Sequence, residues 1–175
     1  MKPVTELQAK TGPFEIERKF LIRYPDIAWL EDQPGCRRIE IVQTYLIADE
    51  GEESRVRRRR TLGCEEYVQT TKRRVSDIRR VEIERVINQE EYERLLLQAD
   101  PACRPIEKTR YCLQHADQLF EIDVYPFWQD QAIMEVELHG EDNAIHFPPQ
   151  LHVIREVTGD VRFRNAALAQ RKPGK

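Results

Sequence analysis

The chain of 175 residues lacks any long hydrophobic run. No stretch approaches the roughly 18 consecutive apolar residues that a membrane helix needs, and the N-terminal sequence MKPVTELQAKTGP lacks the apolar core of a secretory signal. The cysteines, which include no CxxC pair and have no regular spacing, stand at positions 36, 64, 103 and 112. Without a secretory signal they predict free thiols and not a disulfide framework. We therefore predict a soluble cytoplasmic protein that does not bind membranes.

The chain also lacks an excess of charge of one sign. It carries 28 basic and 31 acidic residues, for a net charge of −3, although charged residues make up 34% of it. Proteins that coat nucleic acid are usually strongly basic, so this balance argues against nucleic acid as the partner. It does not exclude a local basic cleft, and the sequence leaves the oligomeric state open.

Short alternating segments fill most of the chain, which is typical of strands. The clearest helix follows Asn88, which can cap it, with Glu91 at the capping-box position three residues on. A second short helix is predicted in RNAALAQ, residues 164–170. About seven or eight strands against so little helix predict a β-dominated α+β fold with antiparallel order. We expect a single domain at 14–170, with a flexible leader at 1–13 and a frayed tail at 171–175.

Charged side chains recur at every second residue. In FEIERKFLI, the residues Glu15, Glu17 and Lys19 share one parity. Because successive side chains of a strand point to opposite faces, these three would project together. Six later segments repeat the pattern with Arg55, Arg57 and Arg59; Lys72 and Arg74; Glu82 and Glu84; Lys108 and Arg110; Glu121 and Asp123; and Glu135 and Glu137.

For any one strand, a solvated sheet face explains a charged parity. Like charges two residues apart lie about 6.6 Å from each other and repel by roughly 2.5 kcal/mol at an effective dielectric of about 20. A surface built for solubility would normally mix the signs. Separated acidic pairs and basic rows predict instead a site for both a polyanion and metal cations. If the strands close into a barrel, the charged parity lines a hydrated channel, while the helix after Asn88 and the terminal helix cover part of the apolar parity.

The series of segments resembles the CYTH superfamily, the triphosphate tunnel metalloenzymes. The resemblance covers about residues 14–170 and implies an eight-stranded antiparallel β-barrel with a few flanking helices, whose lumen binds triphosphate. The matching motifs, in the family's order, are EIERK at 15–19 (the ExExK signature), QTYL at 43–46, RVRRR at 55–59, the lysine of TTKR, EIE at 82–84, KTRY at 108–111, EID at 121–123, EVE at 135–137 and REVTGDVRFRNAALA at 155–169.

The resemblance also implies roles for single residues. The implied ligands of Mg²⁺ or Mn²⁺ are Glu15, Glu17, Glu135 and Glu137, with Asp123 nearby. The residues implied to bind substrate phosphates are Lys19, Arg55, Arg57, Arg59, Lys72, Arg74, Lys108, Arg110 and Arg155. The residues that we expect to be catalytic are Glu15, Glu17, Lys19, Lys72 and Arg155. Arg155 stands where relatives often have lysine.

This resemblance implies metal-dependent hydrolysis of inorganic tripolyphosphate to pyrophosphate and phosphate, without a side-chain nucleophile. Other triphosphate-bearing small molecules remain possible substrates, because the same fold includes class IV adenylate cyclases and thiamine or nucleoside triphosphatases. For these, Trp29 or Trp128 could stack an organic ring, although core packing explains both residues. A non-enzymatic alternative is a polyphosphate- or RNA-binding module built on the RVRRRR run at 55–60.

Overall fold

The computed structural model describes residues 16–74 and 80–170 of the chain. The predicted leader at 1–13, the predicted tail at 171–175 and Glu15 lie outside these ranges. The strands within them are β1 (Ile16–Arg23), β2 (Arg37–Leu46), β3 (Glu52–Thr61), β4 (Cys64–Arg74), β5 (Arg80–Ile87), β6 (Ile106–His115), β7 (Gln118–Val124), β8 (Gln131–Leu138) and β9 (Val153–Glu156). The helices are α1 (Ile27–Asp32), α2 (Gln89–Leu96), α3 (Asn165–Ala169) and the 3₁₀ turn η1 (Val161–Phe163).

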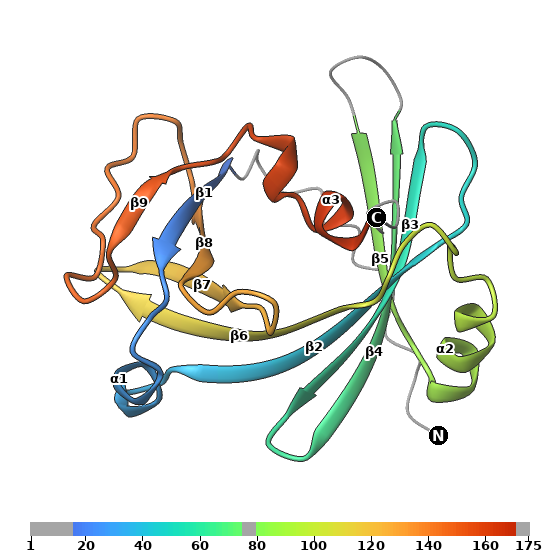
Figure 1. The fold of residues 1–175 in the computed structure, drawn as a ribbon, viewed down its shortest axis with the longest axis horizontal. Helices are drawn as coiled ribbons and strands as arrows, with labels where there is room; N and C mark the ends of the chain where they lie inside the picture. Colours follow the sequence, from blue (N-terminus) through green and yellow to red (C-terminus); the bar gives the residue numbers. More distant parts are fainter. Residues whose placement is uncertain (1–15, 75–79, 171–175) are drawn as a thin grey trace.

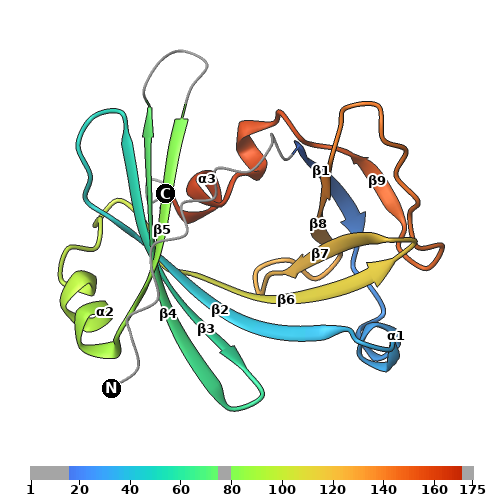
Figure 2. The same cartoon turned by 180° about the vertical axis from the view of Figure 1, so that it is seen from behind.

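All the strand pairings are antiparallel, in the order β5-β4-β3-β2-β6-β7-β8-β1-β9. The β-dominated α+β class and the antiparallel order are therefore confirmed. The strand number is corrected, because the described residues form nine strands where eight were expected. Figures 1 and 2 show the sheet bent so strongly that its edge strands β5 and β9 stand on opposite sides of an opening. Among the described strands no pairing closes this opening into a barrel.

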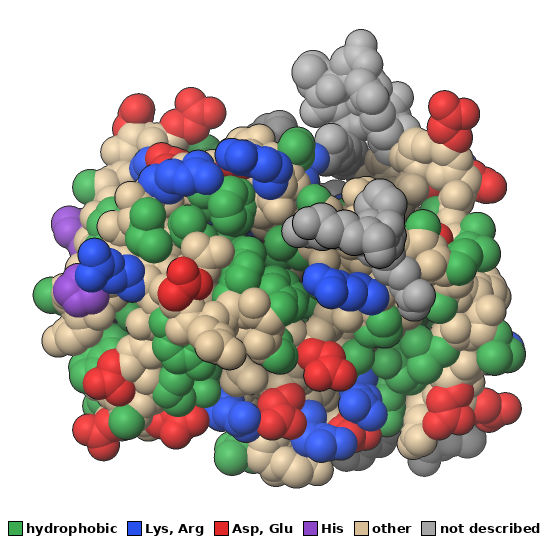
Figure 3. Space-filling view, in the orientation of Figure 1, with side chains coloured by type: hydrophobic (Ala, Val, Ile, Leu, Met, Phe, Trp, Pro, Cys, Tyr) green, Lys and Arg blue, Asp and Glu red, His purple; other side chains and the backbone are tan. Residues whose placement is uncertain are grey.

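The terminal helix α3 lies inside the bend, and the face of the sheet toward it is called the concave face here (Figures 1 and 2). There α3 and η1 pack on a hydrophobic cluster, the α3 cluster, whose buried members are Leu21, Tyr45, Ile106, Tyr125, Ile133, Val157 and Ala169. Figure 3 shows hydrophobic side chains gathered near the centre of the molecule, next to α3. The prediction that the terminal helix covers part of the apolar parity is therefore wrong. Helix α3 instead covers a stretch of apolar side chains that belong to the same parity as the charged residues.

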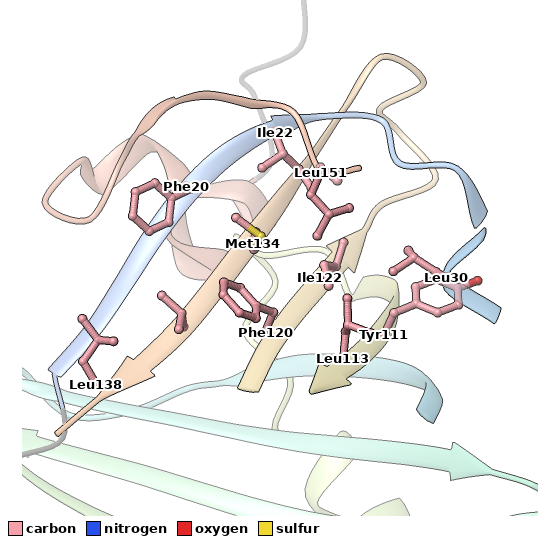
Figure 4. Close-up of a cluster of buried hydrophobic side chains, with 12 residues drawn as sticks. Phe20, Ile22, Leu30, Tyr111, Leu113, Phe120, Ile122, Met134, Leu138 and Leu151 are labelled. Carbon is pink, nitrogen blue, oxygen red and sulfur yellow. The ribbon is translucent and has the colours of Figure 1, made fainter. Parts of the chain in front are cut away.

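The outer face of the sheet is covered by two other hydrophobic clusters. One joins β1, β6, β7 and β8 to α1 through Leu30, with Phe20, Phe120, Ile122 and Met134 fully or almost fully buried (Figure 4). The other packs α2 on β2 to β5. Burial of each large apolar side chain contributes about 1.5–3 kcal/mol, so these clusters hold the sheet in its curved form.

The predicted start of α2 is confirmed in one half of its capping box. The side chain of Asn88 accepts a hydrogen bond from the backbone N–H of Glu91 at 2.8 Å. The Glu91 carboxylate, however, pairs with Arg85 on β5 at 2.5 Å. A tertiary ion pair therefore uses the group that the local pattern assigned to the cap.

No helix in the described part of the chain is long and apolar enough to span a membrane.

Candidate active site

The charged parity of the central strands faces the inside of the bend. Lys19 has the parity of Leu21, and Leu21 belongs to the α3 cluster on the concave face. Only 14% of the Lys19 side chain, 12% of Arg57 and 15% of Arg110 are exposed to solvent. Charges that served only solubility would be exposed, so the low exposure favours an internal polar site.

Cations and carboxylates on β1, β6, β7 and β8 form one connected network. Lys19 Nζ lies 2.9 Å from one oxygen of Glu135, and Arg110 lies 3.2 Å from the other. Arg110 also donates to Glu121 on β7 and to both oxygens of Asp123. Five side chains from four strands thus converge, although the sequence separates Lys19 from Glu135 by more than a hundred residues.

Asp123 and Lys108 form the most deeply buried ion pair of this network. Their side chains are 0% and 3% exposed, and Lys108 Nζ donates to Asp123 Oδ2 at 2.6 Å. Burial alone would raise the pKa of Asp123, but the charges of Lys108 and Arg110 lower it to about 2. Burial lowers the pKa of Lys108, and the attraction of Asp123 opposes that effect. Asp123 is therefore held as a carboxylate between two cations.

The guanidinium groups of β3 form a second cluster, the arginine row, which consists of Arg55, Arg57 and Arg59. Burial and the two neighbouring arginines lower the pKa of Arg57 to about 10, despite its 2.6 Å ion pair with Glu84 on β5. The Nε atoms of Arg55 and Arg57 are buried and find no hydrogen-bond acceptor among the described residues. The arginine row therefore has N–H donors without acceptors and guanidinium charges that repel one another. A bound anion would supply the acceptors and reduce the repulsion.

Strand β5 supplies carboxylates opposite this row. Glu84 also lies 3.4 Å from Arg59, while Glu82 lies 3.5 Å from Lys72 and 3.9 Å from Arg55. Both glutamates are about half exposed, so these pairs are weaker than the buried ones. Glu82 thus links Lys72 to the arginine row, because it lies near both Lys72 and Arg55.

Three of the predicted metal ligands, Glu17, Glu135 and Glu137, share the concave face of β1 and β8. Glu17 lies opposite Glu137 in the strand register, and Lys19 lies opposite Glu135. Burial and the nearby charge of Glu135 raise the pKa of Glu17, so local negative charge is not fully compensated there. In residues 16–74 and 80–170, no group of three or more Asp, Glu, His or Cys side chains is arranged to hold a metal ion. Glu15, the remaining predicted ligand, lies outside these ranges.

Two other predicted residues lie at the margins of the site. Arg155 is on the edge strand β9, where its guanidinium stacks over Phe163 of η1 at 5.1 Å and lies 3.5 Å from Asp160. It is therefore held beside the α3 cluster, apart from the arginine row. Arg74 is the last residue of β4.

The sequence analysis assigned no role in the site to three polar residues that the structure buries on the concave face: Gln43, Tyr45 and Thr70. Thr70 Oγ1 accepts a hydrogen bond from Arg57 at 3.1 Å, and Gln43 Nε2 donates to the Tyr45 phenol at 2.9 Å. A signal was available for Gln43, because it interrupts a register whose preceding members are Ile39 and Ile41. A polar side chain at such a position has to find partners inside the protein.

Comparison with known proteins identifies the family of this fold and site. No family model matches the chain. The chain is 35% identical over 159 residues to a protein of Nitrosomonas europaea named inorganic triphosphatase, in an alignment that spans 89% of this chain and 96% of the relative. The chain belongs to the CYTH superfamily. Within that superfamily it is similar to the inorganic triphosphatases.

The solved structures agree with this assignment. The crystal structure of the inorganic triphosphatase NE1496 matches this CYTH protein with a TM-score of 0.59 at 33% identity, over 92% of this chain and 97% of that one. The PH1819 protein from Pyrococcus horikoshii matches with a TM-score of 0.51 at 21% identity, over 71% of this chain and 77% of that one. The second likeness concerns the fold alone. The tunnel-type fold expected from the sequence is thus confirmed, although the described strands leave it open on one side.

Proposed function

We propose that this CYTH protein hydrolyses inorganic tripolyphosphate to pyrophosphate and orthophosphate. The arginine row carries the proposal, because its central guanidinium, Arg57, is largely buried, and burial together with the charges of Arg55 and Arg59 lowers its pKa to about 10. A phosphate chain would supply the missing negative charge and the missing acceptors. The relative at 35% identity is itself named inorganic triphosphatase.

The cations suit an elongated anion, because they come from several neighbouring strands. Arginines at every second residue of β3 are spaced by about 6.6 Å, so they can contact different phosphate groups of one chain. Lys19 and Arg110 extend the cationic surface across β1 and β6. We propose that substrate phosphates contact Lys19, Arg55, Arg57, Arg59, Lys72, Arg74, Arg110 and, at the margin, Arg155. Lys108 would act through its pair with Asp123, since almost none of its side chain is exposed.

The acidic residues suit a divalent cation by their chemistry, since carboxylate oxygens are the preferred ligands of Mg²⁺ and Mn²⁺. Burial and the nearby charge of Glu135 raise the pKa of Glu17, and a bound cation would oppose both effects. We propose that Glu17, Glu135 and Glu137, together with Glu15, hold the metal. A metal bound there would neutralise phosphate oxygens and lower the pKa of a water molecule. Asp123 is a weaker candidate, because its side chain is completely buried and accepts short hydrogen bonds from both Lys108 and Arg110.

The protein's own cations would perform the remaining work. Guanidinium and ammonium groups fixed on strands can stabilise the charge that develops on the transferred phosphoryl group and the leaving pyrophosphate. Lys19 is already fixed by Glu135, and Arg57 by Glu84 and Thr70, so little reorganisation is needed when substrate binds.

The α3 cluster favours an inorganic substrate over a nucleotide or thiamine triphosphate. It fills one stretch of the concave face with aliphatic and aromatic side chains from β1, β2, β6 and β8. Trp128, a candidate for stacking an organic ring, instead packs against Tyr125 and Phe163 in this cluster. Trp29 packs in an outer cluster with α1. An organic end group at this end of the site would have to displace packed side chains.

Phosphate release from a substrate panel tests the proposal. The panel contains tripolyphosphate, ATP, thiamine triphosphate and long-chain polyphosphate, each assayed with Mg²⁺, with Mn²⁺ and with a chelator. We expect tripolyphosphate to have the highest kcat/KM and to give pyrophosphate and phosphate in equal amounts. Cyclic AMP from ATP, a preference for thiamine triphosphate, or binding of polyphosphate without turnover would each contradict the proposal.

The metal ligands need their own variants. Glu17→Gln and Glu135→Gln should raise the Mg²⁺ concentration that gives half-maximal activity, while Glu107→Gln on the outer face of β6 should not. Full activity of Glu17→Gln at limiting metal would exclude Glu17 as a ligand.

A further inference from the structure

The backbone of Lys19 is bound along the edge of β1 that faces β9. The two strands are antiparallel, and Phe20 lies opposite Glu156 in their register (Figure 1). Val157 follows Glu156, and its backbone N–H donates to the Lys19 carbonyl at 2.8 Å. A regular antiparallel pair would exchange a second bond, from the Lys19 N–H to the Val157 carbonyl. Instead, the Lys19 N–H donates to Oγ1 of Thr158 at 3.0 Å.

Two further groups fix the Thr158 hydroxyl. It donates to Oε1 of Glu156 at 2.6 Å, and Arg18 donates to both oxygens of that carboxylate at 2.9 and 2.7 Å. A hydroxyl has one proton and can also accept, so the bond to Glu156 uses the proton and leaves a lone pair for the Lys19 N–H. The hydrogen bonds from Arg18 and Thr158 lower the pKa of Glu156 to about 2. Glu156 is therefore a carboxylate at neutral pH.

Val157 anchors the same segment on the other face of the sheet. Its side chain is 2% exposed and belongs to the α3 cluster, whereas Arg18 and Glu156 have the opposite parity and lie on the outer face. The Arg18–Glu156 pair is itself about a third or more exposed on both sides, and such pairs contribute little to stability. Its effect is on position, because it fixes the hydroxyl that binds the backbone of Lys19.

The side chain of Lys19 extends into the site from this fixed backbone. Lys19 lies opposite Glu135 in the β1–β8 register, and its Nζ lies 2.9 Å from the Glu135 carboxylate. Because the backbone N–H and carbonyl of Lys19 both bond toward β9, Lys19 and Glu135 form the non-hydrogen-bonded kind of antiparallel pair, in which the side chains are closest. A shift of the β1 backbone at Lys19 would therefore move its ammonium group relative to Glu135 and to a bound phosphate.

We propose that Thr158 is a positioning residue, which holds the Lys19 backbone so that the ammonium group meets the substrate phosphates, while Glu156 and Arg18 fix the Thr158 hydroxyl. This proposal rests on the proposed function for the contact between Lys19 and the substrate. Thr158 acts only through Lys19. The simpler interpretation, a hydroxyl that merely joins β9 to β1, predicts that its loss has the same effect whether or not Lys19 is present.

Thr158→Val separates the two interpretations, because valine keeps the shape of the side chain and removes the hydroxyl. Isothermal calorimetry with tripolyphosphate and a chelator measures binding without metal-dependent turnover. We expect Thr158→Val to weaken the affinity about fivefold, and Thr158→Ser, which keeps the hydroxyl, to stay within about twofold of wild type. In the Lys19→Met background, Thr158→Val should change the affinity by less than about twofold, because the residue through which it acts is missing.

The matched control is Thr71→Val on β4. Thr71 has the parity opposite to Thr70, which bonds to Arg57 in the site, so its side chain lies on the outer face. This variant should bind tripolyphosphate with the affinity of wild type.

Equal affinity of wild type and Thr158→Val would overturn the proposal, as would a loss that Thr158→Ser shares or an equal loss in the wild-type and Lys19→Met backgrounds. A separate hydrolysis assay keeps this result apart from the proposed function. If wild-type protein binds tripolyphosphate without hydrolysing it, the proposed function fails, while the affinities still decide the role of Thr158. No binding of tripolyphosphate by wild type would overturn both.

Discussion

Lys108 Nζ lies 2.6 Å from Asp123 Oδ2, and both side chains are almost completely buried. The resemblance assigned one of these residues to the phosphate and placed the other near the metal, yet the structure joins them to each other. Arg110 completes the arrangement from the same strand as Lys108. Asp123 therefore also sets the position of Arg110, which faces the site. Removal of the Asp123 carboxylate should affect stability as well as activity.

Asp123→Asn should destabilise the protein by about 3–5 kcal/mol, because it leaves Lys108 and Arg110 buried without their shared anion. Urea unfolding followed by circular dichroism measures the difference. Glu107→Gln, on the outer face of β6, is the control and should stay within about 0.5 kcal/mol of wild type. A loss of less than 1 kcal/mol in Asp123→Asn would show that the ion pair contributes little.

The same carboxylate predicts an acid-dependent loss of stability. The folded pKa of Asp123, about 2, lies below its ordinary value of 3.8. A depressed carboxyl pKa stabilises the fold at pH values above the ordinary pKa, and this stabilisation disappears as the pH falls from about 4 through 2. The stability difference between wild type and Asp123→Asn should therefore shrink by roughly 2 kcal/mol over that interval. A difference that is constant from pH 6 to pH 2 would contradict the assigned ionisation.

Arg57→Ala should lower kcat/KM for tripolyphosphate by about 10- to 100-fold, since hydrogen bonds to charged groups contribute about 1.5–3 kcal/mol. Arg58→Ala changes the neighbouring residue of the same strand, which points to the outer face, and should stay within about threefold of wild type. Raising the ionic strength should reduce the difference between wild type and Arg57→Ala only partly, because the site is largely buried. Equal losses in the two variants would place the row outside the substrate site.

The α3 cluster should limit which triphosphates bind. Phe163→Ala shortens a side chain that packs on Trp128, and it should raise the activity with ATP relative to tripolyphosphate. Leu95→Ala, which shortens a side chain of α2 that packs in the outer cluster, is the control for destabilisation. Both variants should lose about 1–3 kcal/mol of stability, but only Phe163→Ala should change the substrate ratio. An unchanged ratio in Phe163→Ala would show that packing at this end does not select the substrate.

Local patterns predicted the features that depend on residues close in the sequence. The two-residue alternation runs through RRIEIVQTYLI at 37–47 and EEYVQTTKRRV at 65–75, and β2 and β4 occupy these segments to within about one residue. Asn88 was predicted to cap α2 and does so. The shared face of Arg55, Arg57 and Arg59 also followed from the two-residue period alone, because that period is a property of the extended backbone.

The sequence by itself thus determined the strands, their antiparallel class and which charges share a face. Only the tertiary structure decided which charges meet: Glu91 binds Arg85, Asp123 binds Lys108 and Arg110, and α3 packs inside the bend. The physical reason is range. Backbone alternation acts within a few residues, whereas ion pairing and apolar burial depend on register and curvature, which bring together strands more than a hundred residues apart in the sequence.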